Sequence, residues 1–225
     1  MDSITAVIPV RAGSRRMKNK NIAPFNGTTL LEHKIEILKK VPEITKIVVT
    51  SDSEYMLGLA EKHEVDTHRR PDEYCDEVSR TFGETVRLVC SAIEGDHILW
   101  APCTSPLVYP ALYSKAILLY FQALKDGYDS LISVELFKHF MWDEEKPLNY
   151  ELGEKQVPSQ LLPNLYVVTN GILLSPREKA IELAYTYGHH PYKLEIDKCA
   201  TVDIDDELDL IQAKAWLDSN LDKFV

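Results

Sequence analysis

Two short stretches near opposite ends of the chain carry side chains suited to binding phosphates and a metal ion. The first is "RAGSRRMKNKN", Arg11–Asn21, which places five cationic side chains within eleven residues. Small residues there would let backbone N–H groups approach an anion, and the cations would surround it with charge. The small residues are Ala12, Gly13 and Ser14, and the cations best placed for this role are Arg11, Arg15 and Lys20. The stretch predicts a polyphosphate site, with a solvated basic turn as the alternative because it matches neither Walker A nor G-x-G-x-x-G.

The second stretch is "TVDIDDELDL", in which Asp203 and Asp205 are two residues apart. On an extended segment both carboxylates face the same side, so that they can bind one Mg²⁺. In the alternative interpretation Asp205 caps the last helix, while Asp206 and Glu207 lie at the positive end of that helix. Capping explains Asp205 but not Asp203. Beside a cationic loop, the pair predicts magnesium-assisted phosphoryl chemistry.

Composition limits the classes of protein to which the chain can belong. Its 225 residues are 45% hydrophobic and 27% charged, which predicts one domain over residues 1–225 with a well-buried core. A formal net charge of −10 argues against binding to nucleic acid or to a membrane surface. The four cysteines are widely spaced and form no C-x-x-C pair, which is typical of a reduced, cytoplasmic protein. No apolar run is long enough for a signal peptide or a membrane span.

Apolar runs rich in β-branched residues alternate with segments of helical period. This pattern predicts an α/β fold of three layers with a mostly parallel sheet. Two helices begin with the spacing of a capping box, Thr29 with Glu32 and Thr81 with Glu84. The basic loop follows the first strand, at the sheet edge where open α/β proteins bind ligands. We expect strands at 4–10, 46–51, 97–102, 130–135 and 166–175, helices at 29–41, 53–62, 83–93 and 111–125, and a short strand near residue 200 that leads into a last helix.

The alternation lapses between residues 137 and 165. Structureless loops of that length are uncommon inside a compact domain. This segment also carries aromatic side chains that a solvated linker would not need, namely Phe137, Phe140, Trp142 and Tyr150. It predicts a projecting arm that packs on a partner subunit of a homodimer.

Six motifs, taken in order, resemble a known family. They are "IPVRAGSRRMKNKNI", "VVTSDSEYMLGLA", "RRPDEYCDEVS", "TSPL", "TNGILL" and "VDIDDELDL". Over its whole length the chain is similar to the cytidylyltransferases that activate acylneuraminate and related 3-deoxy sugar acids as CMP-sugars. The resemblance implies a nucleotidyltransferase fold of the GT-A or Rossmann-like kind, with residues 137–165 as its dimerisation arm. It also implies transfer of CMP from CTP to an acidic sugar, with Mg²⁺ as cofactor.

The same resemblance assigns roles to individual residues. It implies that Arg11, Ser14 and Lys20 surround the triphosphate, that Asn21 reaches the base, and that Asp203 and Asp205 bind the metal. Arg11, Lys20 and Asp205 would be catalytic. Arg70 and Ser79 match positions that shape the cytidine pocket. The sugar side would comprise Thr104, Ser105, Gln160 and Asn170, with Lys138 acting from the neighbouring subunit.

Two positions depart from the family pattern on the sugar side. Pro102 stands where the family usually has a glutamine, and Ser159 stands where sialic acid enzymes tend to have an arginine. Loss of that arginine weakens recognition of a carboxylate, because an arginine–carboxylate pair is bidentate and charge-assisted. Two alternatives therefore stay open: a related nucleotidyltransferase that uses another nucleotide or a sugar phosphate, and a nucleotide-binding protein without turnover. His189 and His190 are interpreted as a polar turn, since adjacent residues on an extended chain point to opposite faces.

Overall fold

The computed structural model describes residues 2–14, 16–76 and 78–224. Its centre is a seven-stranded sheet with the order β5-β4-β1-β6-β8-β7-β9. Four neighbouring pairs are parallel, and only β8 runs antiparallel to both of its neighbours. The predicted mostly parallel sheet is thus confirmed. The strands are β1 (Ile4–Pro9), β4 (Lys46–Ser51), β5 (Asp66–Arg69), β6 (His97–Trp100), β7 (Ser130–Phe137), β8 (Leu165–Pro176) and β9 (Pro191–Glu195), and β2 (Pro24–Phe25) with β3 (Thr28–Thr29) forms a separate hairpin.

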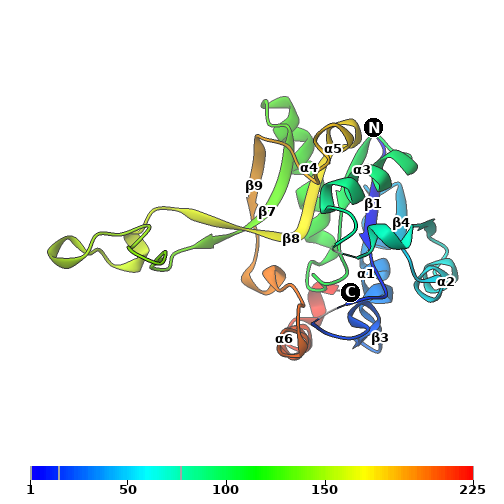
Figure 1. Cartoon of the computed structure of the whole chain (residues 1–225), viewed down its shortest axis with the longest axis horizontal. Helices are drawn as coiled ribbons and strands as arrows, with labels where there is room; N and C mark the ends of the chain where they lie inside the picture. Colours follow the sequence, from blue (N-terminus) through cyan, green and yellow to red (C-terminus); the bar gives the residue numbers. More distant parts are fainter. Residues whose placement is uncertain (1, 15, 77, 225) are drawn as a thin grey trace.

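Helices cover both faces of the sheet, which gives three layers (Figure 1). Side chains of β1 alternate between two hydrophobic cores, as strand geometry requires. Ile4, Ala6 and Ile8 pack with one set of helices, whereas Val7 packs with the other. The first set is α1 (Leu30–Lys39), α2 (Glu54–Lys62), α4 (Pro110–Lys125) and α6 (Glu207–Asp218), and the second is α3 (Phe82–Ala92) and α5 (Arg177–Leu183). None of the described helices is both long and apolar enough to cross a membrane.

The capping patterns in the sequence predicted two helix starts correctly, whereas the alternative interpretation of Asp205 as a helix cap is not confirmed. Both predicted capping boxes form, Thr29 with Glu32 and Thr81 with Glu84. The last helix is capped by Asp206, whose side chain accepts hydrogen bonds from the backbone N–H groups of Leu208 and Asp209. Capping by Asp205 is therefore wrong. Asp206 satisfies two of the free N–H groups at this helix start.

The short strand expected near residue 200 is also wrong. Lys198–Thr201 forms a 3₁₀ helix instead. The sheet edge beside β7 is taken by β9, which the sequence pattern did not reveal. His189 and His190 lie in the bend before β9, where their backbone N–H groups donate to the Asp129 carboxylate. They form the expected polar turn.

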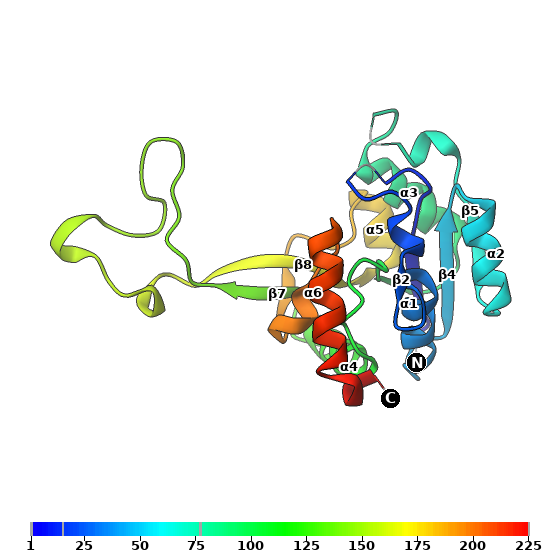
Figure 2. The ribbon, with the colours of Figure 1, turned by 90° about the horizontal axis from the view of Figure 1, so that it is seen from below.

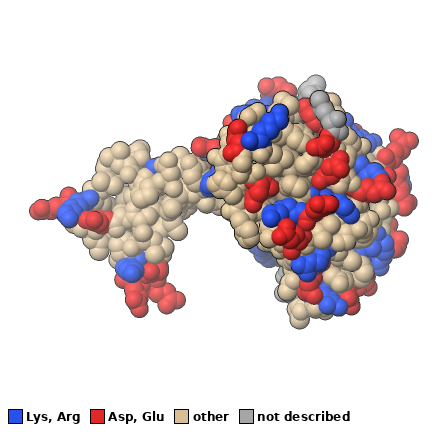
Figure 3. All heavy atoms as spheres, turned by 90° about the horizontal axis from the view of Figure 1, so that it is seen from above, with Lys and Arg blue, Asp and Glu red and all other residues tan. Residues whose placement is uncertain are grey.

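The segment between β7 and β8 projects away from the body of the protein (Figures 1 and 2). Its ends are defined by the sheet, because Phe137 pairs with Leu165 where the two strands leave it. Large apolar side chains on the arm are exposed, including Trp142 at 52% and Leu161 at 70%. Charged residues gather at the tip and one side of the arm, and most of the face seen in Figure 3 is uncharged. The arm thus offers an unpartnered apolar surface.

Candidate active site

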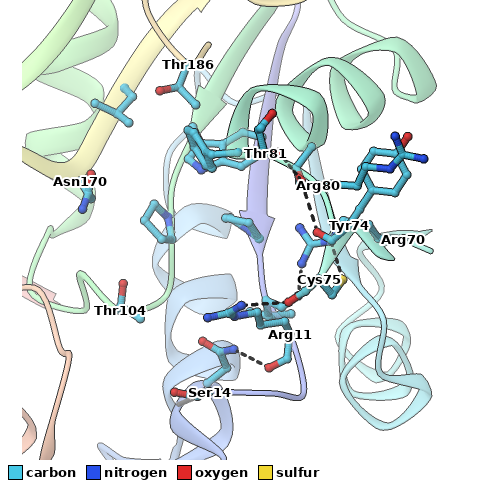
Figure 4. A pocket seen from close by; sticks show the side chains of 18 of the residues that line it. Arg11, Ser14, Arg70, Tyr74, Cys75, Arg80, Thr81, Thr104, Asn170 and Thr186 are labelled. Carbon is cyan, nitrogen blue, oxygen red and sulfur yellow. Dashed lines mark hydrogen bonds between the residues drawn. The ribbon is translucent and has the colours of Figure 1, made fainter. Parts of the chain in front are cut away.

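An open cleft of about 790 Å³ lies at the carboxyl ends of the central parallel strands. The loop after β1, the loops around residues 70–82 and 100–104, strand β8 and the segment 185–187 contribute to its walls (Figure 4). This is the edge at which open α/β sheets bind ligands. The topology therefore brings the predicted basic loop to a cleft that other elements complete.

Backbone carbonyls hold two of the residues predicted to lie on the nucleotide side. Arg11 Nη1 donates to the carbonyl oxygen of Cys75 at 2.9 Å. Asn21 is buried, donates to the carbonyl oxygen of Arg11 at 3.0 Å and accepts from the Cys103 thiol at 3.3 Å. Arg11 and Asn21 both line the cleft. Their positions are fixed by the protein before any ligand enters.

Arg70 joins two walls of this part of the cleft. Its side chain is only 4% exposed and donates to the Val10 carbonyl at 2.7 Å and to Cys75 Sγ at 2.9 Å (Figure 4). Burial raises the pKa of the Cys75 thiol, although the Arg70 guanidinium opposes that rise. Because the guanidinium is committed to protein groups, Arg70 contributes to the shape of the cleft.

The two ends of the chain meet beside the cleft. Lys20 Nζ lies 3.1 Å from Asp205 Oδ1, and Arg16 Nη1 lies 2.7 Å from Asp205 Oδ2. Lys20 and Arg16 also line the cleft. The cationic loop and Asp205 thus form one charged cluster, although Lys20 and Asp205 are 185 residues apart in the sequence.

Asp203 is suited to binding a cation. Asn170 Nδ2 donates to its Oδ2 at 2.9 Å, whereas its buried Oδ1 has no hydrogen-bond partner among the described residues. A buried carboxylate oxygen without a partner is costly, and an oxygen of this kind is the ligand that Mg²⁺ prefers. No group of three or more His, Cys, Asp and Glu in the described parts of the chain could hold a metal. This Oδ1 of Asp203 fits a cation ligand, whereas both oxygens of Asp205 are ion-paired with Lys20 and Arg16, and neither aspartate is among the residues that line the cleft.

The remaining nucleotide-side candidates differ in where they lie. Ser14 lines the cleft, and Ala12 and Gly13 are exposed on the same loop, with the Ala12 N–H donating to Asp52 at 2.9 Å. Ser79 does not line the cleft, and its hydroxyl donates to Asp76 at 2.6 Å. The predicted contribution of Arg15 falls outside the described residues.

The sugar-side candidates are only partly brought together within one chain. Thr104, Asn170 and Pro102 line the cleft, while Ser105 is buried behind it. Lys138 and Gln160 lie in the segment that projects from the body, where Lys138 Nζ donates to the carbonyl oxygen of Leu162. They do not line the cleft of their own chain.

Sequence reasoning missed an aromatic wall in the cleft. The ring of Phe82 lies 6.0 Å from that of Trp100 and 5.8 Å from that of Tyr185, edge to face in both cases. Phe82 and Tyr185 are 50% and 42% exposed. The sequence did indicate where Phe82 lies along the chain, because it follows the capping residue Thr81 as the first residue of a helix. The members of this wall are Phe82, Trp100, Tyr185 and Tyr187, whereas Tyr74 lines the cleft beside Arg80 (Figure 4).

Comparison with solved structures defines the class of fold. The chain is similar to a CMP:2-keto-3-deoxy-manno-octonic acid synthetase solved with CTP, with a TM-score of 0.67 and 13% identity over 96% of this chain and 99% of that one. It is also similar to a 4-diphosphocytidyl-2C-methyl-D-erythritol synthase from Anaerococcus prevotii, with a TM-score of 0.69, 15% identity and the same coverage. At these identities the likeness shows the fold, which is that of the nucleotidyltransferases.

The family follows from the sequence match. The cytidylyltransferase family model matches residues 5–149, more than half of the chain, which therefore belongs to the cytidylyltransferase family. An N-acylneuraminate cytidylyltransferase from Escherichia coli O18:K1:H7 is 24% identical over 214 residues, covering 92% of this chain and 50% of that protein. A 3-deoxy-manno-octulosonate cytidylyltransferase from Geotalea uraniireducens is 26% identical over 114 residues, covering 51% and 43%. The chain thus spans about half or less of these relatives.

Proposed function

We propose that this protein transfers CMP from CTP to an acidic sugar and releases pyrophosphate. The observation that carries the proposal is the charged cluster in which Asp205 meets Lys20 and Arg16 beside the cleft. Such a cluster offers cations for a triphosphate and a carboxylate for the metal that accompanies it. Membership of the cytidylyltransferase family supports CTP as the nucleotide.

In the proposed reaction, a sugar hydroxyl attacks the α-phosphorus of CTP in line. A new O–P bond forms, the bond from the α-phosphorus to the bridging oxygen breaks, and the hydroxyl proton is released. No covalent enzyme intermediate is needed. Arg11 and Lys20 stabilise the negative charge on the departing pyrophosphate. Asp203 and Asp205 would hold Mg²⁺, which when bound would neutralise phosphate charge and orient the reacting groups.

The acceptor binds on the uncharged side of the cleft. Thr104 and Asn170 offer hydrogen bonds to sugar hydroxyls there, and the aromatic wall offers apolar contact. Since Pro102 and Ser159 supply no charge, the cation for the sugar carboxylate comes from Lys138 of the partner subunit. The exposed apolar residues of the arm support a homodimer in which each arm reaches the neighbouring cleft.

Pyrophosphate release tests the proposal directly. CTP, UTP, GTP and ATP are each incubated with sialic, legionaminic, pseudaminic or octulosonic acid, with Mg²⁺ or with a chelator. We expect release with CTP and one class of acidic sugar, and its loss on chelation. Thermal stabilisation by CTP without pyrophosphate release from any acceptor would instead identify a nucleotide-binding protein. Release with another nucleotide, or with a sugar phosphate, would identify a different nucleotidyltransferase.

A further inference from the structure

A lysine is buried beneath the sugar side of the cleft. Lys34, on α1, is completely inaccessible to solvent. Its ammonium group donates to the carbonyl oxygen of Ser105 at 2.7 Å and to the hydroxyl of Tyr113 at 2.8 Å. It forms no ion pair with any described carboxylate. Burial lowers the pKa of its amine to about 7, although Cys103 and Asp203 oppose that shift. A lysine is rarely buried in this way without a partner of opposite charge.

The contacts of this lysine connect the two walls on which the sugar side is built. One wall is the loop that carries Thr104, whose neighbour Ser105 accepts directly from Lys34. The other is β8, where the Tyr113 hydroxyl donates to the carbonyl oxygen of Gly171 at 3.1 Å, next to Asn170. Lys34 thus reaches one wall directly and the other through Tyr113.

The same network extends to the metal-binding candidates. Asn170 donates to Asp203, and the backbone N–H of Ile204 donates to the carbonyl oxygen of Thr104 at 2.8 Å. The two walls also approach closely, since a Cβ at Gly171 would lie 2.7 Å from Val108 Cγ2. A small displacement of either wall would therefore move Thr104, Asn170 and Asp203 relative to one another.

We propose that Lys34 is a positioning residue, which fixes Thr104 and Asn170 relative to Asp203 and thereby sets where the acceptor hydroxyl lies. The expected effect on kcat rests on the proposed function, whereas the role of Lys34 in holding Thr104 and Asn170 relative to Asp203 does not. An apolar side chain at this position would avoid the cost of burying an amine. The amine remains useful because it bonds two separate elements at once, which no hydrocarbon side chain can do.

The test compares Lys34→Met with Lys39→Met, a control on the same helix whose amine is partly exposed and only 3.8 Å from Glu36. Misplacement of about 1 Å typically costs a hundredfold in rate. We therefore expect K34M to lower kcat by about tenfold to a hundredfold, with the KM for CTP changed less than about twofold and the unfolding midpoint unchanged or higher. K39M should match the wild type. Tyr113→Phe removes both the hydrogen bond from Lys34 and the link to Gly171 but keeps the bond from Lys34 to Ser105, and it should give the same split between kcat and the KM for CTP.

Hydrogen–deuterium exchange provides a readout that needs no turnover. In K34M, the amides of Ile204, Thr104, Ser105, Leu107 and Val108 should exchange at least about tenfold faster than in the wild type. If the wild type proves inactive, the proposed function fails and this exchange result alone decides the role of Lys34. Wild-type kcat and wild-type exchange in K34M would overturn the inference. So would a loss of CTP binding and stability in proportion to kcat, because that result indicates a purely structural role.

Discussion

The two halves of the cleft are built in different ways. In the nucleotide half, Arg11, Asn21 and Arg70 are each held by a backbone carbonyl within 3.0 Å. In the half to which we assign the sugar, Phe82 and Tyr185 are about half exposed, and the lining residues contributed by β6, β8 and segments 102–104 and 185–187 carry no charge. The first half therefore holds cationic side chains in fixed positions suited to an anion. The second half has an uncharged lining that a ligand would contact mainly through apolar groups.

Under the proposed function, this difference would let one fold keep its nucleotide while its acceptor varies. Charge and backbone contacts define a triphosphate site tightly, because the phosphates are alike in every nucleotide. Acceptor recognition depends on side chains from several separate elements, and any of these can change without disturbing the basic loop. We expect mutations in the two halves to separate the kinetics of CTP from those of the sugar.

The largest effect is expected for Asp205→Ala, which acts on the nucleotide half. Loss of this carboxylate removes a metal ligand, and loss of one group that stabilises developing charge typically costs a hundredfold to a thousandfold. Pyrophosphate release should fall by about that factor, while CTP still stabilises the fold in a thermal shift. Asp206→Ala is the matched control, since it removes only a helix cap worth about 1 kcal/mol and should retain turnover. Full activity in D205A would remove the metal role.

Deletion of the arm is expected to have the next largest effect, because it should strongly reduce CMP transfer but leave CTP binding intact. Because Phe137 pairs with Leu165, residues 138–164 can be replaced by a two-residue turn that closes the hairpin. We expect a monomer by light scattering, retained CTP binding and a loss of CMP transfer of about a hundredfold, since a positioning element is removed. Lys138→Ala in the full chain should raise the KM for the sugar but leave the dimer intact. A wild-type monomer, or transfer by the deletion variant, would contradict the role in the neighbouring cleft.

Tyr185→Ala should have a smaller effect, confined to the sugar half. Removal of an aromatic contact worth about 1.4 kcal/mol corresponds to tenfold in affinity. The KM for the acidic sugar should therefore rise by about tenfold while that for CTP stays constant, as measured by initial rates of pyrophosphate release. Tyr55→Ala, at a 61% exposed position on α2, is the control. An equal rise in both KM values would show that the two halves are not separate.

The smallest effect concerns stability and tests the burial of Lys34 beneath the sugar half of the cleft. The pKa of Lys34 is lowered to about 7 by burial, and in the unfolded chain it is near 10.4. Between these values the unfolded chain binds more protons, so that the free energy of unfolding rises with pH by up to about 1.4 kcal/mol per unit. The stability is lost progressively as the pH falls from about 10.4 to about 7, and below that value the two states bind the same number of protons. Urea unfolding from about pH 7 to pH 9 should show a steeper rise in the wild type than in K34M, and equal slopes would contradict a buried, titrating amine.

Features that depend on neighbouring residues could be predicted from the sequence. The capping boxes at Thr29 and Thr81 need only a glutamate three residues later, and both form. The arm was visible because its strands end where the alternation of apolar residues ends. Lys34 also left a signal that was not used, since it lies between Leu31 and Leu38 on the buried side of α1. A lysine on such a stripe indicates a buried amine.

Other features were decided only by the tertiary structure. Strand β9 was hidden because an edge strand of five residues carries little periodic signal, and Lys198–Thr201 forms a 3₁₀ helix after it. The aromatic wall joins α3, β6 and residues 185–187, whose spacing in the chain says nothing of their proximity. The sequence by itself determined the charges on the two ends of the chain. Only the folded sheet, by placing the end of β1 beside the approach to α6, brought Lys20 within 3.1 Å of Asp205.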